Sequence, residues 1–170
     1  MKNFYELFVH ELRDMYAAEV KIGKILPEMA KKARFPKLKE AFHVHHKETK
    51  KQIKRLEKIA DQLGIILKKC KCEAIDGIIK EGKKLIKEHY YPEVIDAALI
   101  ISAQRVEHYE MAVYGILKSF AKYLKLKEIL EILDESSKEE GHADKKLTEI
   151  AMGTLFSSGV NEKAIKRKSA

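Results

Sequence analysis

The sequence predicts an all-α protein built as a bundle of four long helices, and three observations lead to this prediction. The chain has 170 residues, which is enough for one compact domain of ordinary size. It contains only 8 glycines and 3 prolines, too few turn residues for a protein of many short strands. Apolar residues recur at helical spacing along four long segments.

The first two segments predict a helical hairpin. The first helix is expected from about Phe4 to Lys32, and Pro27 inside it should bend the helix or end it early. Residues 33–37 form the turn. The second helix is expected from about residue 38 to residue 63, where Gly64 is a natural stop.

The next two long helices predict a second hairpin, reached by a crossover. Residues 64–91 are long enough to carry the chain from one end of a bundle to the other, and they include a shorter helical pattern at about 74–88. Pro92 opens the third long helix, which should end near Tyr123, and the fourth should span about 127–155. Two helical hairpins joined by one long crossover is the connectivity of the ferritin-like bundles.

We therefore expect one ferritin-like domain over residues 1–159. Residues 160–170 are expected to form a flexible tail, because they carry several basic residues at the end of the chain. The tail lies outside the four predicted helices.

Charge and cysteine content narrow the possible functions. The net charge is +8, but it comes from lysines scattered over the expected solvent faces, so nucleic-acid binding is not favoured. Cys70 and Cys72 fit neither a disulfide framework nor a four-cysteine zinc site, and we expect reduced thiols. The first residues lack the apolar run of a signal peptide, and no stretch is long enough to cross a membrane. These features predict a cytoplasmic protein.

Acidic residues interrupt each of the four apolar stripes near its middle. At about 100° per residue, their side chains point toward the interior of the bundle or lie at the edge of its inner face. They also lie at similar distances from the hairpin turns, so they should meet at one level of the bundle. The candidate metal ligands are Glu19, His45, Glu48, Glu107, Glu110, Glu140 and Asp144.

A group of buried carboxylates is unfavourable unless something compensates the charge. Several carboxylates at one level would repel one another strongly, and two divalent or trivalent cations would relieve this repulsion. The alternative is a network satisfied by shared protons, buried water and inward Lys or Arg, but the sequence places no Lys or Arg at these positions. A carboxylate-rich site with one histidine suits iron or manganese better than zinc or copper, so we predict two metal ions, iron first and manganese second.

Two strings match the usual Glu-x-x-His signature of di-iron bundles but point the wrong way. They are Glu40-x-x-His43 and Glu139-x-x-His142, and both histidines should face roughly 160° from the inward faces of their helices. The second helix offers the reverse order, His45-x-x-Glu48, with both side chains on one face. We therefore expect His43 and His142 to be exposed.

Several motifs resemble those of the YciE/YciF-type ferritin-like stress proteins. The likeness covers about residues 4–152 and implies a helical bundle with a di-metal centre, a homodimer, and a stress-response role whose reaction is not established. The motifs are Glu11-Leu12-Arg13-Asp14-Met15-Tyr16-Ala17-Ala18-Glu19, Leu26-Pro27-Glu28-Met29-Ala30, Ala41-Phe42-His43-Val44-His45, Val106-Glu107-His108-Tyr109-Glu110 and Glu139-Glu140.

Three classes of function are open at this point. A redox enzyme of the peroxidase or oxidase type would use two irons to reduce peroxide or oxygen. A metal-handling protein would bind or oxidise iron without a further substrate. A helical scaffold would bind a protein or nucleic-acid partner through its surface, and Lys-rich runs such as residues 68–71 would then be part of that surface.

Overall fold

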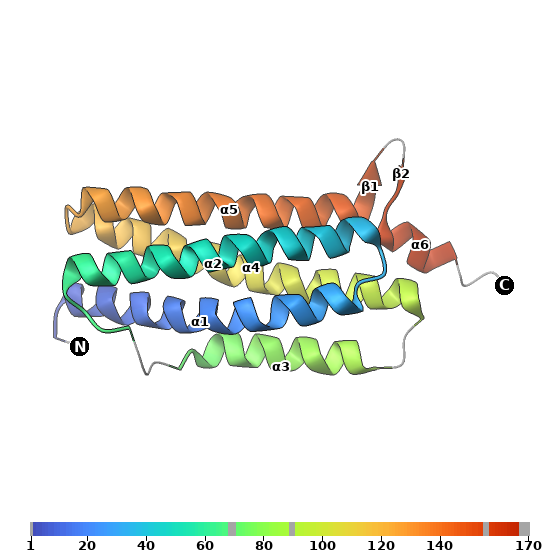
Figure 1. Cartoon of the computed structure of the whole chain (residues 1–170), viewed down its shortest axis with the longest axis horizontal. Coiled ribbons are helices and arrows are strands. Elements are labelled where there is room, and N and C mark those ends of the chain that lie inside the picture. Colours follow the sequence, from blue (N-terminus) through green and yellow to red (C-terminus); the bar gives the residue numbers. More distant parts are fainter. Residues whose placement is uncertain (1, 68–70, 89–90, 155–156, 167–170) are drawn as a thin grey trace.

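The protein is a bundle of four long helices with a shorter helix along one side (Figure 1). The computed structural model describes residues 2–67, 71–88, 91–154 and 157–166. This architecture confirms the prediction of two helical hairpins joined by a long crossover. The helices are α1 (Phe4–Lys32), α2 (Pro36–Leu63), α3 (Glu73–Lys87), α4 (Pro92–Tyr123), α5 (Lys127–Met152) and α6 (Val160–Lys166).

Local sequence signals explain where the first hairpin begins and ends. The side chain of Asn3 accepts a hydrogen bond from the backbone N–H of Glu6 at 2.8 Å and so caps α1. Pro27 does not end the helix early, because α1 continues to Lys32. Gly64 ends α2 with φ of 64°, a left-handed conformation that glycine adopts without steric cost.

The turn between α1 and α2 is held by a carboxylate from α4. Asp96, which is only 5% exposed, accepts hydrogen bonds from the backbone N–H of Arg34 at 2.8 Å and of Phe35 at 2.9 Å. A charged acceptor strengthens both bonds. The first hairpin is therefore fixed at one end to the first part of α4.

The end of the chain differs from the prediction. The fourth long helix ends at Met152, not near residue 155, because Gly153 has φ of 81° and turns the chain out of the helix. Two strands of two residues each follow, with β1 (Gly153–Thr154) antiparallel to β2 (Ser157–Ser158). Residues 155 and 156 lie outside the described residues.

Residues 160–166 are helical, although we expected the whole of 160–170 to be a flexible tail. Helix α6 packs on α4 and α5, and Val160 is 2% exposed. The ammonium of Lys163 lies 4.2 Å from the centre of the Phe35 ring. The ordered chain thus extends past residue 159, while residues 167–170 lie outside the described residues.

The core consists of two apolar clusters, one toward each end of the bundle. One cluster contains residues such as Ile22, Leu38 and Leu99 and packs against α3. The other contains residues such as Phe8 and Leu117. The buried polar and charged side chains of the four long helices fall mostly between these two clusters, at the middle level of the bundle. None of the helices in the described ranges has an apolar stretch long enough to span a bilayer.

Candidate metal centre

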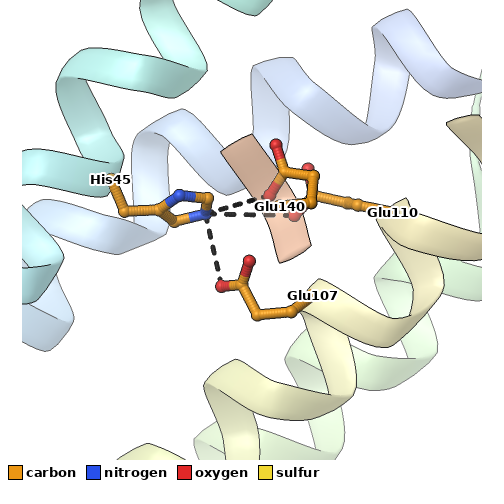
Figure 2. A group of neighbouring side chains, drawn as sticks. All are labelled: His45, Glu107, Glu110 and Glu140. Carbon is orange, nitrogen blue, oxygen red and sulfur yellow. Dashed lines mark ion pairs between the residues drawn. The ribbon is translucent and has the colours of Figure 1, made fainter. Parts of the chain in front are cut away.

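Four side chains from three helices meet at the middle level of the bundle (Figure 2). His45 comes from α2, Glu107 and Glu110 from α4, and Glu140 from α5. One potential ligand atom from each lies within 4.8 Å of the ligand atoms of all the others, and all four residues are buried. We refer to these residues as the four-residue cluster.

The imidazole of His45 faces three carboxylates. Its Nε2 lies 3.3 Å from Glu107 Oε1, 3.8 Å from Glu140 Oε2 and 3.9 Å from Glu110 Oε2. Figure 2 shows the carboxylates arranged around this nitrogen, with Glu107 and Glu110 projecting from one face of α4. Their separation of three residues places them on the same side of the helix.

Glu19 brings a further carboxylate to this level from α1. It is completely buried, and the hydroxyl of Tyr114 donates a hydrogen bond to its Oε1 at 2.5 Å. Its other oxygen, Oε2, has no hydrogen-bond partner among the described residues. Glu19 is not part of the four-residue cluster, although its charge interacts with that of Glu140.

The structure does not bring Glu48 and Asp144 into the four-residue cluster. The Glu48 side chain is 29% exposed, and its Oε2 lies 3.8 Å from Nδ1 of His45, on the far side of the ring. Asp144 instead lies 3.2 Å from Nε2 of His108 and accepts a hydrogen bond from Gln104 at 3.2 Å. These two residues belong to the edge of the site.

The two Glu-x-x-His strings supply no ligand from their histidines. His43 and His142 are both exposed, as their direction on the helical wheel predicted. Their glutamates behave differently: Glu40 is exposed, whereas Glu139 pairs with Arg55 at 2.5 Å.

Gln52, a polar neighbour of the cluster, was not among the candidate site residues predicted from the sequence. This side chain is completely buried, and its amide nitrogen donates hydrogen bonds to Glu140 Oε1 and, at 3.0 Å, to Glu139 Oε2. Gln52 lies seven residues after His45, so it shares the inner face of α2. The spacing of seven residues could have predicted that Gln52 faces the site. The spacing of four residues between His45 and Thr49, which is also completely buried, could have done the same for Thr49.

Many polar atoms of the site lack a hydrogen-bond partner. A buried polar group without a partner costs about 1–3 kcal/mol, and native proteins have few of them. Here they concentrate at one place, which indicates that a group outside the chain satisfies them. Among the described residues these atoms are Glu19 Oε2, both ring nitrogens of His45, Thr49 Oγ1, Gln52 Oε1, Glu107 Oε2, both carboxylate oxygens of Glu110 and Glu140 Oε2.

Burial and mutual repulsion shift the protonation of the acids. Burial, followed by the charge of Glu140, raises the pKa of Glu19 to about 8. Burial also raises the pKa values of Glu107 and Glu110 well above the ordinary range, and that of Glu140 in the same direction. The metal-free site therefore keeps protons on carboxylic acids at neutral pH.

His45 responds in the opposite way. Burial alone would lower its pKa, but the charges of Glu107, Glu140 and Glu19 and the neighbouring carboxylate of Glu48 raise it to about 10. Without a metal, the imidazolium is thus the only cationic group in the four-residue cluster. With a metal, the same ring would be neutral and would offer a nitrogen ligand.

The donor set fits a hard or borderline cation. Carboxylate oxygens with one imidazole nitrogen are the ligands that iron and manganese prefer, and the partnerless oxygens are available to bind such ions. Arg55 of α2 is engaged with Glu139 and Glu135. Among the described residues, no lysine or arginine contacts the carboxylates of the four-residue cluster, so the protein supplies no cation other than His45.

A buried thiol lies beside Tyr109 of α4, outside the four-residue cluster. Cys72 caps α3, and its Sγ lies 3.0 Å from the hydroxyl of Tyr109, which donates a hydrogen bond to Asp14 at 2.8 Å. Burial raises the pKa of the Cys72 thiol, so the protonated thiol is favoured over the thiolate. Cys70 lies outside the described residues.

Comparisons with known proteins place these features in a context. Residues 3–164 match a family described as a domain of unknown function, DUF892. The chain is 38% identical over 165 residues to Protein YciF of Escherichia coli strain K12, with 96% of both chains covered. This likeness confirms the resemblance seen in the sequence motifs.

Solved structures share the fold. The Escherichia coli stress protein YciF superposes with a TM-score of 0.86 at 38% identity, over 89% of this chain and 96% of that one. YcfI from Rhodopseudomonas palustris, presented as a candidate structural protein, gives the same TM-score and coverage at 39% identity. A protein from Xanthomonas campestris, at 18% identity and a TM-score of 0.72, covers 99% of this chain and shares the fold alone.

Proposed function

This chain belongs to the DUF892 family, and on that premise we propose that it is a stress protein that carries two metal ions, iron in the first place, in the core of its bundle. The observation that supports the proposal best is the four-residue cluster with its partnerless oxygens. Glu19 adds a fifth buried side chain at the same level.

The proposal for two ions rather than one depends on Glu110 and Glu140. The charge of Glu110 interacts with those of Glu19 and Glu107, and the charge of Glu140 also interacts with both. Together with His45, Glu107 and Glu19, these two residues would hold the two ions. Glu48 and Asp144 lie at the edge, where they would complete the coordination of an ion only after a side-chain movement.

Neighbouring residues of the chain prepare the site for such ions. Tyr114 fixes the orientation of Glu19, and Gln52 fixes that of Glu140. The apolar clusters above and below separate the site from water at the two ends of the bundle. When bound, a pair of reduced irons would supply two electrons to peroxide or oxygen.

Further properties follow from the family and the composition as proposals. We propose that the protein acts in the cytoplasm, as a homodimer, on a small oxidant such as peroxide or oxygen. Oxidation of iron as a means of storing or removing it would use the same residues and is the nearest variant of this function.

A second candidate function is a scaffold without turnover. The description of the Rhodopseudomonas palustris relative as a candidate structural protein favours it. In that case the carboxylic acids would keep their protons and His45 would remain the counter-charge. Replacement of these side chains would then change the free energy of unfolding but not the metal content of the protein.

Metal content per chain tests the proposal. We expect about two irons per chain after expression in iron-supplemented medium, and a loss of metal in His45→Ala and Glu110→Gln. The matched controls are His43→Ala and Glu131→Gln, exposed positions on α2 and α5, which should keep the metal. Elemental analysis and iron spectroscopy on all five proteins provide the measurement. A wild-type protein with little metal, or equal metal in all five, would exclude the di-metal function.

A further inference from the structure

A pocket opens next to the metal centre, between α2 and α5. Its volume is about 480 Å³, and its lining includes His45 and Glu107 of the four-residue cluster. Both residues are buried, at 4% and 1% exposure, so the pocket reaches from the surface to the core of the bundle. This pocket therefore gives access to two of the candidate metal ligands, His45 and Glu107.

The size of this pocket exceeds what a small oxidant needs. One water molecule occupies about 30 Å³, and hydrogen peroxide or oxygen is only slightly larger. Pockets of about 300–1,000 Å³ are those that enclose organic ligands and cofactors. A passage for peroxide alone would not require this volume.

The walls of the pocket are apolar. Ala41, Phe42 and Val44 line it from α2, and Ala143 and Leu147 line it from α5. Phe42 and Leu147 are 2% and 3% exposed, so they belong to the core as well as to the pocket. Such walls favour a ligand with an apolar body.

Charged side chains of both signs surround the apolar walls. Because groups of both signs are present, they produce no strong field of one sign, and the lining favours an uncharged ligand over an anion or a cation. These residues are Lys37, Glu40, Glu48 and Lys146.

We propose that this pocket binds a neutral, apolar organic molecule whose oxygen-bearing end lies against His45 and Glu107, and that the substrate class is an organic hydroperoxide. The redox part of this inference depends on the proposed di-metal function. The reaction would break the O–O bond of ROOH with one electron from each of two reduced metal ions and two protons from solvent. The products would be ROH, water and two oxidised metal ions.

Ligand binding tests the pocket without reference to turnover. The probe is 2-phenylpropan-2-ol, the alcohol that corresponds to cumene hydroperoxide, titrated into the full-length protein and followed by NMR amide shifts and calorimetry. We expect saturable binding, with shifts on α2 and α5 around Val44 and Ala143. Ala143→Phe fills the pocket from α5, and Val44→Trp narrows it from an exposed position on α2.

Both substitutions should weaken binding by about tenfold or more, which corresponds to about 1.4 kcal/mol. Ala112→Phe, at an exposed position on α4, is the matched control and should bind like the wild type. An absence of binding to the wild type would overturn the pocket proposal. So would equal binding by the wild type and the Val44→Trp protein, which keeps its fold because Val44 is exposed.

Peroxide consumption by the metal-loaded protein separates this inference from the function on which it depends. We expect Ala143→Phe to slow the consumption of cumene hydroperoxide about tenfold more than that of hydrogen peroxide, because the smaller peroxide still passes a narrowed pocket. Equal slowing of both would overturn the organic substrate class. Consumption of hydrogen peroxide without binding of the alcohol would overturn the pocket proposal and leave the metal function standing. Binding of the alcohol without consumption of either peroxide would overturn the redox function and leave the pocket proposal standing.

Discussion

The hydroxyl of Tyr114 on α4 donates a hydrogen bond to the carboxylate of Glu19 on α1, at 2.5 Å and with both side chains completely buried. This bond joins the two central parts of helices that lie in different hairpins. It also leaves one oxygen of Glu19, Oε2, without a partner among the described residues. Tyr114 thus holds Glu19 in place while one carboxylate oxygen is free to bind a cation.

Replacement of Tyr114 by Phe should weaken the metal centre. The substitution leaves both oxygens of Glu19 without a partner, so we expect a loss of about 1–3 kcal/mol in the free energy of unfolding of the metal-free protein. The metal affinity should fall about tenfold or more, because Glu19 loses its fixed orientation. Urea denaturation and metal titration measure the two effects.

The control for this prediction is Tyr16→Phe. The Tyr16 hydroxyl donates to Glu57 at 3.0 Å in an exposed pair, so its loss should change stability by less than about 0.5 kcal/mol and leave metal affinity unaltered. Equal metal affinity in the Tyr114→Phe and Tyr16→Phe proteins would contradict the role assigned to Tyr114.

Glu110→Leu should make the metal-free protein more stable and abolish metal binding. Neither oxygen of Glu110 has a hydrogen-bond partner among the described residues, and the side chain is completely buried. An apolar side chain there removes the cost of burying a carboxyl group, so we expect a gain of about 1–3 kcal/mol in the free energy of unfolding. Thermal and urea unfolding of chelator-treated protein provide the measurement.

A surface position separates this effect from a general gain in hydrophobicity. Glu131→Leu, on the exposed face of α5, should change stability by no more than about 0.5 kcal/mol and keep the metal. A metal-free Glu110→Leu protein that is less stable than the wild type would show that the carboxyl group of Glu110 is satisfied within the chain.

The metal-free protein should lose stability as the pH rises from about 5 to about 8. The pKa of Glu19 is raised to about 8 in the folded state, so between its ordinary value and 8 the folded state binds more protons than the unfolded state. His45, with its pKa raised to about 10, acts in the same direction above its ordinary value of 6.5. The contributions of Glu19 and His45 to the free energy of unfolding therefore both decrease as the pH rises.

Urea unfolding at several pH values checks this prediction, with Glu19→Gln as the comparison. The variant cannot titrate at position 19, so its stability should depend less steeply on pH between 5 and 8. Metal binding should show the opposite sign and strengthen with rising pH, because the ions displace protons from the ligands. A metal-free wild type whose stability rises over this range would contradict the shifted pKa values.

Asp96→Ala should destabilise the fold without removing the metal. Asp96 accepts two backbone hydrogen bonds at the α1–α2 turn, at one end of the bundle and about three helical turns before Glu107 on α4. We expect a loss of about 2–4 kcal/mol in the free energy of unfolding, measured by urea denaturation. Asp61→Ala, at an exposed position of α2, is the control and should have little effect. Loss of metal from a folded Asp96→Ala protein would contradict the separation of the turn from the site.

Most of the candidate site was predictable because it follows from helical geometry alone. Glu19, Glu110 and Glu140 lie on apolar stripes and at matched distances from the hairpin turns, and the structure places all three in the core at the middle level. His45 was predictable for the same reason. The direction of a side chain on a helical wheel does not show how far its atoms extend toward a site. The sequence therefore could not exclude Glu48, whose Oε2 lies 3.8 Å from Nδ1 of His45, outside the four-residue cluster.

Other features depend on contacts that no local pattern reveals. Helix α6 has only seven residues, too few for a reliable apolar period, and it packs on α4 and α5 after the chain has turned at Gly153. Gln52 was missed because an uncharged polar residue on an inner face gives a weaker signal than a carboxylate. The pocket between α2 and α5 depends on the spacing of two helices, which the sequence does not specify.

The buried polar and charged side chains between the two apolar clusters also determine how the helices align along the bundle axis. Bundles with a continuous leucine core tolerate a slide of one helix by a turn, because one apolar side chain replaces another. Here a slide of α5 by one turn, about 5.4 Å, would move Glu140 away from His45 toward an apolar cluster. The buried carboxylates that weaken the metal-free protein therefore exclude every register but one.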